Sequence, residues 1–337
     1  MSLEERNHWI EAAKEKVIFD EGKTNKAVDD IMFLYDETAF EIENRINALF
    51  TKYATDNKLS SSEANRLISG KEYSVWKKSI DDYVAKVAEE AADSKTLLEL
   101  NTLAMKSRIS REEQLLADVY RHMAELANDT STDLTALLGD ITRTSYYRSC
   151  FNIQKGIGAC FEVGKISDRV IDNILKYPWA KKKFSKTVWD NVDTISALTK
   201  RVITRGFISG SGCQKMVKEI DDVMGKGKDA AERVVRTECK YFANQGELQG
   251  YKENGITQYV FMGGTEGSIG CECADYNGQV IDVDKAEAGV NFPPMHPNCL
   301  CTVRAHFEKS VFEDRLGTVP LKDNLKYKEW KDKYIDH

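Results

Sequence analysis

The uneven distribution of proline is the feature that most constrains this fold. The chain has 337 residues and five prolines, and Pro178 is the only one before residue 293. Proline removes a backbone donor and breaks helix interiors, so this distribution permits long helices over most of the chain. Pro293, Pro294 and Pro297 then fall within five positions, which indicates a different kind of structure from about residue 240 onward.

Apolar spacing also favours helices in the N-terminal region. Two series of residues, each with a spacing of seven, together form a helical seam with alternating steps of four and three. They are Val28, Tyr35, Ile42 and Leu49, and Met32, Ala39, Ile46 and Tyr53. The seam fits a long helix of an antiparallel bundle, and an intermolecular coiled coil remains the alternative.

The same reasoning predicts further helices and the breaks between them. Capping-box spacing at Ser60 and Glu63 indicates one helix start, and Ser110 with Glu113 indicates another. We expect helix over 110–126, a polar break at 128–132, helix again through Leu134, and further helices over 184–205 and 213–223. Glycine and lysine alternate over 225–228, which we interpret as a helix-to-helix turn because phosphate-loop spacing is missing.

Composition narrows the class of protein. Lys and Arg total 48 and Asp and Glu total 54, a net charge of −6, which argues against a protein that coats nucleic acid. Hydrophobic residues make up 42%, enough for a sizeable core. The sequence has no run of 18 uncharged apolar residues and no apolar segment after its acidic N-terminus, so we expect no membrane span and no secretory signal. In a reducing cytosol, clustered cysteines are more often metal ligands than disulfides.

The C-terminal region carries such a cluster. Four of the eight cysteines lie within 31 residues, and one histidine falls among them. The candidate ligands for a structural zinc ion are Cys271, Cys273, His296, Cys299 and Cys301. Reduced core cysteines and a disulfide are the alternatives, and a catalytic metal is disfavoured because several thiolates would close the site.

Local geometry supports this interpretation. Two prolines extend the backbone before His296, and Pro297 with Asn298 suits the centre of a tight turn. The turn would bring an imidazole and a thiolate to the same side. Strand alternation would place both members of each Cys-x-Cys pair on one face. We also expect a strand over 258–261 and a hairpin at Asn277-Gly278.

At this point the sequence resembles a known family, the phage Mu F-like minor head proteins, also called head morphogenesis proteins of tailed bacteriophages. The resemblance covers 187–307, and its most specific part is His296-Pro297-Asn298-Cys299 followed by Cys301. Other matching residues are Arg236-Thr237-Glu238, Asn244, Gly255-Ile256, Tyr259-Val260-Phe261, Cys271, Cys273 and Asn277-Gly278. Leu300 stands where the family usually has arginine, and the first cysteine pair is Cys-x-Cys where the family has Cys-x-x-Cys.

The fold class that we expect is mainly α, with a long helical N-terminal region and a small α+β C-terminal domain containing a Cys/His cluster. We predict a helical scaffold over 1–186, a Mu F-like domain over 187–308 and a tail over 309–337. The resemblance implies a low-copy, non-enzymatic component of the virion head near the portal vertex, present in the host cytoplasm during assembly. It implies portal, capsid and scaffold proteins as partners, with phage DNA a further candidate and no membrane.

Two alternatives stay open at this stage. Arg236, Thr237 and Glu238 are superficially similar to an ADP-ribosyltransferase motif, with Glu238 as the general base. The structural interpretation is that Arg236 and Glu238 make hydrogen bonds or an ion pair. A nucleic-acid-binding zinc knuckle is the second alternative, and the acidic residues around the cysteines oppose it.

Overall fold

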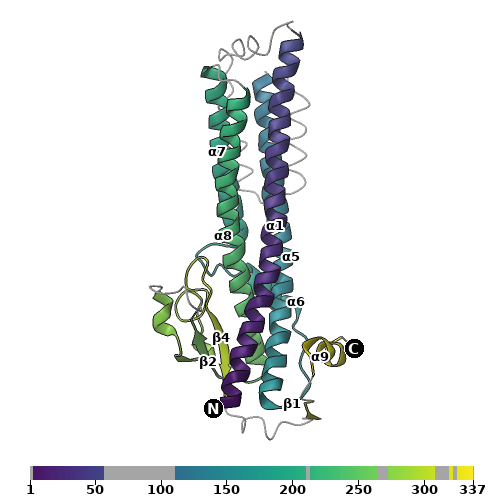
Figure 1. Ribbon diagram of the computed structural model, residues 1–337, viewed down its shortest axis with the longest axis vertical. Helices are drawn as coiled ribbons and strands as arrows, with labels where there is room; N and C mark the ends of the chain where they lie inside the picture. Colours follow the sequence, from purple (N-terminus) through teal and green to yellow (C-terminus); the bar gives the residue numbers. More distant parts are fainter. Residues whose placement is uncertain are drawn as a thin grey trace. The chain divides into compact units, whose positions relative to one another are not determined.

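The structure is a computed structural model that describes residues 3–56, 111–209, 213–263, 272–307, 319–321 and 325–336. Helices dominate it (Figure 1). The helices are α1 (Leu3–Asp56), α5 (Arg111–Ile157), α6 (Asp168–Lys176), α7 (Phe184–Ser209), α8 (Cys213–Glu253) and α9 (Tyr327–Tyr334). The helix predicted from Ser60 lies outside the described residues. The predicted fold class is confirmed: long helices come first, and a small sheet with a Cys/His cluster follows.

The polar break predicted at 128–132 is wrong, because α5 continues through it without interruption. The helical phase explains why. Ala127, Thr130, Leu134 and Leu138 are all buried and follow each other in steps of three and four. Thr130 therefore occupies a seam position, and the polar residues around it extend from the other faces of the same helix.

The turn predicted at 225–228 is also wrong, since α8 runs from Cys213 to Glu253 as one helix. Gly227 is required for close packing. A Cβ atom there would lie 2.9 Å from the Tyr35 ring and 3.1 Å from Ile195. The glycine thus lets three helices approach one another, a tertiary role that sequence spacing does not distinguish from a turn.

The chain divides into two compact units, both built from segments far apart in sequence. One contains 1–27, 134–183 and 233–337, and the other contains 28–133 and 184–232. The second unit is helical in its described part, with Tyr35, Ile42 and Ile46 of the predicted seam fully buried. The division into three consecutive domains, 1–186, 187–308 and 309–337, stays a prediction from the sequence.

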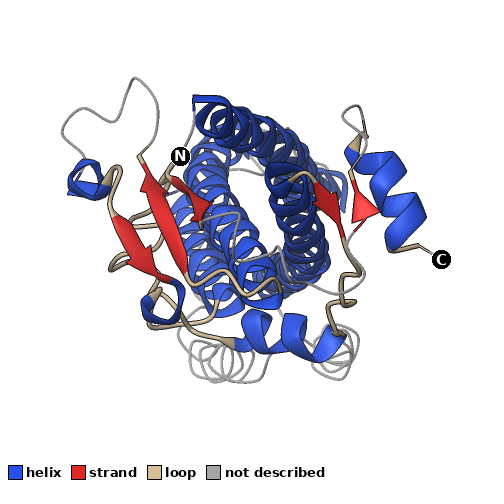
Figure 2. Cartoon of the chain, turned by 90° about the horizontal axis from the view of Figure 1, so that it is seen from below, coloured by secondary structure: helices blue, strands red, loops and turns tan. Residues whose placement is uncertain are grey.

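The first unit carries all the strands that the structure describes. A three-stranded antiparallel sheet has the order β3-β2-β4, with β2 (Gln258–Met262) in the centre. Its outer strands are β3 (Val280–Asp282) and β4 (Thr302–His306), and Tyr259 pairs with Ile281 on one side and Ala305 on the other. The predicted strand over 258–261 is confirmed. Figure 2 shows this sheet and α9 on opposite sides of the unit's helical segments.

The turn at Asn277-Gly278 exists, but it does not join two strands. Gly278 has a φ of +83°, as a left-handed turn residue requires. The segment before it, Glu272–Tyr276, is a 3₁₀ helix (η1) in place of the expected strand. β3 pairs instead with β2, which lies earlier in the chain.

Small residues bring α5 and α8 together in the first unit. Gly246 and Gly250 of α8 face Thr142 and Ser149 of α5, and a Cβ atom at Gly250 would lie 2.6 Å from the Ser149 side chain. The Ser149 hydroxyl donates a hydrogen bond to the Glu247 carbonyl oxygen at 3.2 Å. Such close backbone approach leaves no room for larger side chains.

The C-terminal tail packs onto the protein itself. Trp330 of α9 is fully buried beside Phe151, and its Nε1 donates a hydrogen bond to Gln154 Oε1 at 2.8 Å. Just before it, β5 (Val319–Pro320) pairs with β1 (Ala159–Cys160). None of the helices in the described part of the chain combines the length and apolar character needed to cross a membrane.

Candidate metal centre

The loop from Pro293 to Cys301 forms the turn that the sequence predicts. The Cys299 backbone N–H donates a hydrogen bond to the His296 carbonyl oxygen at 3.2 Å, which closes a four-residue turn. Asn298 occupies its third position with a φ of +59°, a left-handed conformation that asparagine tolerates better than most residues. The reversal directs His296 and Cys299 toward the same side.

Three of the five predicted ligands meet in space. The ligand atoms of Cys273, His296 and Cys299 all lie within 4.8 Å of one another. The distance between Cys273 Sγ and His296 Nε2 is 3.5 Å. A tetrahedral zinc with the usual Zn–S and Zn–N bond lengths places a sulfur and a nitrogen ligand about 3.5 Å apart, so this spacing suits a shared ion.

The histidine ring is oriented by its second nitrogen. His296 Nδ1 lies 2.8 Å from the Pro297 carbonyl oxygen, a distance suited to a hydrogen bond. With the proton on Nδ1, the Nε2 lone pair faces Cys273 and is available for a metal. This arrangement, in which one ring nitrogen donates to a carbonyl while the other binds, is typical of metal-ligating histidines.

The remaining two candidates have different outcomes. Cys301 is buried in the same cluster, and a hydrogen bond between its thiol and that of Cys299 is the largest influence that lowers the pKa of Cys299 to about 5. Cys271 lies outside the described residues. The thiolate is the form that binds a metal, so a low pKa at Cys299 favours ligation. Cys271 and Cys301 are the two candidates for a fourth ligand.

The predicted alternation holds for the second cysteine pair. Cys299 and Cys301 are buried, whereas Leu300 between them is 61% exposed. In the first pair, Cys273 lies on η1, so the strand assumption is wrong for that residue. A 3₁₀ helix still brings Cys273 into the cluster, since its burial against Phe261 fixes the position of the thiol.

Helix α8 holds the ligand loop at two points. The Asn298 backbone N–H donates to Thr237 Oγ1 at 3.1 Å, and Asn244 Nδ2 donates to the Pro293 carbonyl oxygen at 3.1 Å. Asn244 is fully buried. The Thr and Asn that the sequence singled out on this helix are therefore positioning residues for the loop.

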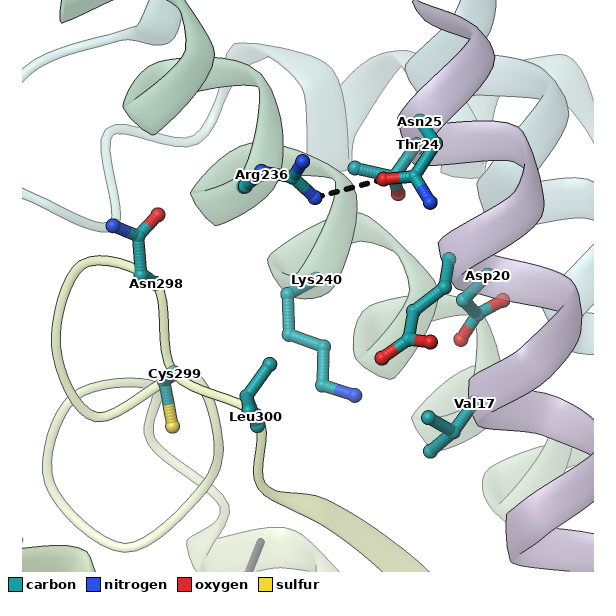
Figure 3. A pocket seen from close by; sticks show the side chains of 10 residues that line it. Val17, Asp20, Thr24, Asn25, Arg236, Lys240, Asn298, Cys299 and Leu300 are labelled. Atoms are coloured by element: carbon teal, nitrogen blue, oxygen red, sulfur yellow. Dashed lines mark hydrogen bonds between the residues drawn. The ribbon is translucent and has the colours of Figure 1, made fainter. Parts of the chain in front are cut away.

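The neighbours of Thr237 also make structural hydrogen bonds. Arg236 donates from Nη1 to Asn25 Oδ1 at 2.9 Å (Figure 3). Glu238 accepts from Trp179 Nε1 at 3.0 Å, and burial raises the pKa of this carboxyl to about 7. The structural interpretation of the Arg-Thr-Glu segment predicts hydrogen bonds of this kind for Arg236 and Glu238.

A buried polar network links the N-terminal helix to the sheet, and sequence reasoning missed it. Lys16 Nζ donates to Asn244 Oδ1 at 2.9 Å, to Thr302 Oγ1 at 3.0 Å and to Glu247 Oε2. Glu247 also accepts from the Tyr251 hydroxyl at 2.7 Å. Lys16 is only 6% exposed. The residues around Lys16 in the sequence are ordinary helix residues. The one signal that could have identified it as buried is that a lysine occupies a position on the apolar face of the helix.

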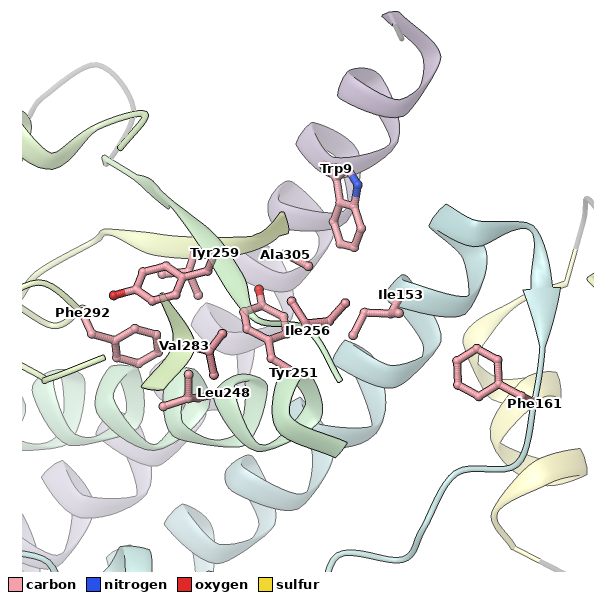
Figure 4. Packing of buried hydrophobic residues seen from close by; sticks show 11 residues of the cluster. Trp9, Ile153, Phe161, Leu248, Tyr251, Ile256, Tyr259, Val283, Phe292 and Ala305 are labelled. Carbon is pink, nitrogen blue, oxygen red and sulfur yellow. The ribbon is translucent and has the colours of Figure 1, made fainter. Parts of the chain in front are cut away.

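A hydrophobic core supports the sheet that carries the site (Figure 4). Tyr259 and Phe292 pack edge to face with ring centroids 5.4 Å apart, and both are fully buried. The core continues through residues from α1, α5, α8 and the strands. It includes Trp9, Ile153, Leu248, Tyr251, Ile256, Val283, Val303 and Ala305. The ligand loop therefore begins next to a well-packed residue, Phe292.

Comparison with known proteins identifies one family. Residues 198–304 match the family described as phage Mu protein F like protein. The match contains the whole of α8, the strands β2 and β3, the first part of β4 and the whole ligand loop. It confirms the resemblance read from the sequence and supports a phage head-related protein. Comparisons with curated proteins and with solved structures gave no match.

Proposed function

Since residues 198–304 match the phage Mu F-like family, we propose that this protein is a minor capsid protein of a tailed bacteriophage. It would act in low copy at the portal vertex of the virion head and aid head assembly and DNA packaging or delivery. The observation that carries this proposal is the family match, which includes the His296-to-Cys301 loop. Its partners would be the portal protein, capsid and scaffold proteins, and phage DNA.

The role that we propose is structural and not enzymatic. Long helices such as α1, with 54 residues, and α5, with 47, provide extended surfaces for protein contacts. Arg236 and Glu238, which an enzymatic reading would need for chemistry, are engaged by Asn25 and Trp179. Transfer of label from NAD by the purified protein, lost in Glu238→Gln, would contradict this part of the proposal.

Within that role, we propose that a zinc ion joins η1 to the ligand loop. Cys273 would bind from η1, and His296 and Cys299 from the loop. The zinc would supply cross-linking and no reaction. Because the loop is also fixed to α8 through Thr237 and Asn244, zinc ligation would stabilise the C-terminal part of the first unit as a whole.

Co-expression with the neighbouring phage head genes tests the main proposal. The tagged protein should retain the portal protein in a pulldown, and purified procapsids should contain it in fewer copies than the major capsid protein. A truncated chain that lacks the matched region 198–304 serves as the comparison. Soluble protein that is absent from particles and does not retain the portal protein would refute a head-vertex role.

A further inference from the structure

A second candidate site lies beside the ligand loop. A pocket of about 200 Å³ opens between α1, α8 and the segment 298–300 (Figure 3). All of its lining residues belong to the first unit. It is lined by Val17, Asp20, Glu21, Thr24, Asn25, Arg236, Lys240, Asn298, Cys299 and Leu300.

Two opposite charges in this pocket are held apart. Asp20 extends from α1 and Lys240 from α8, on facing sides of the pocket (Figure 3). Asp20 is 7% exposed, and its Oδ2 is sealed from solvent without a hydrogen-bond partner. Within the described part of the chain, Lys240 makes no hydrogen bond either, and the two groups interact only electrostatically.

Burial shifts the pKa of both Asp20 and Lys240 toward the neutral form of each group. Burial raises the pKa of Asp20 and lowers the pKa of Lys240, and in each case it outweighs the attraction between them. The nearby buried cation, Lys16, is already engaged by Glu247. Asp20 is a buried acceptor and Lys240 a neighbouring donor, and neither has a hydrogen-bond partner among the described residues. A ligand that binds between them therefore gains two hydrogen bonds.

The charge balance of the lining selects the ligand class. Two acidic residues, Asp20 and Glu21, face two basic ones, Arg236 and Lys240. The pocket therefore does not favour an anion or a cation, and a neutral group loses the least hydration on entry. That group must offer a hydrogen-bond donor to Asp20 and an acceptor to Lys240. A water molecule does both, but the cavity has room for several times its volume.

The walls and rim add two requirements. Val17 and Leu300 provide apolar surface suited to methylene groups, and Leu300 is 61% exposed beside the opening. We propose that this pocket receives a carboxamide side chain, asparagine or glutamine, presented by a partner polypeptide. Its NH₂ group donates to Asp20 and its oxygen accepts from Lys240, while Leu300 packs against the partner's adjacent surface. This inference does not depend on the proposed function.

Small neutral probes test the ligand class on the full-length protein. N-acetyl-glutamine methylamide should bind saturably, with a Kd on the order of millimolar, as expected for a ligand of this size. The isosteric N-acetyl-glutamate methylamide, N-acetyl-leucine methylamide and inorganic phosphate should each bind about tenfold more weakly or not at all. Isothermal titration calorimetry measures all four on the same preparation.

Variants then assign the site. Lys240→Met and Asp20→Asn should each weaken glutamine-probe binding about tenfold, whereas Lys226→Met, a lysine of the same helix outside the pocket lining, should leave it unchanged. The absence of saturable glutamine-probe binding up to about 50 mM would overturn the inference, given the affinity expected for this ligand size. Equal or tighter binding of phosphate or the glutamate probe would do so too. The ligand comparison uses the unaltered protein, so it stands even if a variant does not fold.

Discussion

Cys273 Sγ and His296 Nε2 lie 3.5 Å apart although 23 positions separate them in the sequence. Cys273 belongs to a 3₁₀ helix and His296 to a turn after two prolines, so no single element fixes their distance. It is fixed by packing: Cys273 is buried against Phe261 of the central strand, while α8 holds the turn through Thr237. The spacing suits zinc, and the first prediction tests that role.

The protein should bind one equivalent of zinc. Cys299→Ser removes a thiolate, and we expect stoichiometry well below one, because a structural site rarely tolerates the loss of a ligand. Metal analysis by mass spectrometry measures this on protein purified without a polyhistidine tag. Cys213→Ser is the matched control, since Cys213 lies in the other unit and contacts Asn47. Wild-type protein with much less than one zinc per chain would count against the site.

Glu238→Gln should remove part of the pH dependence of stability. Burial raises the pKa of Glu238 from 4.5 to about 7, so its favourable contribution is present below pH 4.5 and is lost as pH rises through 7. The shift corresponds to about 3 kcal/mol. Glutamine stays neutral and still accepts from Trp179.

Urea unfolding at pH 5 and pH 8 measures this difference. Between these pH values, wild-type stability should fall by about 2 kcal/mol more than that of Glu238→Gln. Other titrating groups cancel in the comparison because both proteins contain them. Parallel pH profiles for the two proteins would show that the carboxyl is not desolvated as described.

Gly246→Ala should destabilise the first unit. A Cβ atom at this position would overlap the Thr142 carbonyl oxygen, which belongs to the backbone of α5 and has little freedom to move. We expect a loss of about 1–3 kcal/mol in the free energy of unfolding, typical of overpacking. Urea unfolding of the variant and the wild-type protein measures it.

Gly225→Ala in the same helix is the control for this substitution. A Cβ atom at Gly225 would have no atom within 4 Å, so the added methyl group meets open space. The change should be neutral or stabilise by up to about 1 kcal/mol, because alanine favours helix more than glycine does. A Gly246→Ala protein as stable as this control would mean that α5 and α8 are not in close contact.

Trp330→Ala should release the C-terminal tail. The substitution removes a fully buried side chain and leaves Gln154 Oε1 without its donor, at a cost of about 3–5 kcal/mol to tail docking. Limited proteolysis should then cleave within 308–337 much faster than in wild-type protein. Lys328→Ala, at an exposed position of α9, should not change the cleavage rate. Equal protection of Trp330→Ala and wild type would contradict the docking of α9.

The sequence by itself determined the kinds of local structure. Proline placement predicted the long helices, and the heptad series containing Tyr35 and Ile42 predicted a buried seam, because helix periodicity is set by the chain's own geometry. The His296-to-Cys299 turn was also predictable, since proline fixes φ at Pro297 and asparagine tolerates the left-handed conformation that Asn298 adopts.

Tertiary structure decided what those elements do together. Thr130 and Gly227 look like interruptions in the sequence, but each sits where another part of the protein packs against its helix. Lys16 pairs with Glu247, and Asp20 lines the same pocket as Lys240. In each case the two residues are more than 200 positions apart in the sequence. Local propensity carries no information on such contacts, because they depend on how the assembled helices exclude water from particular side chains.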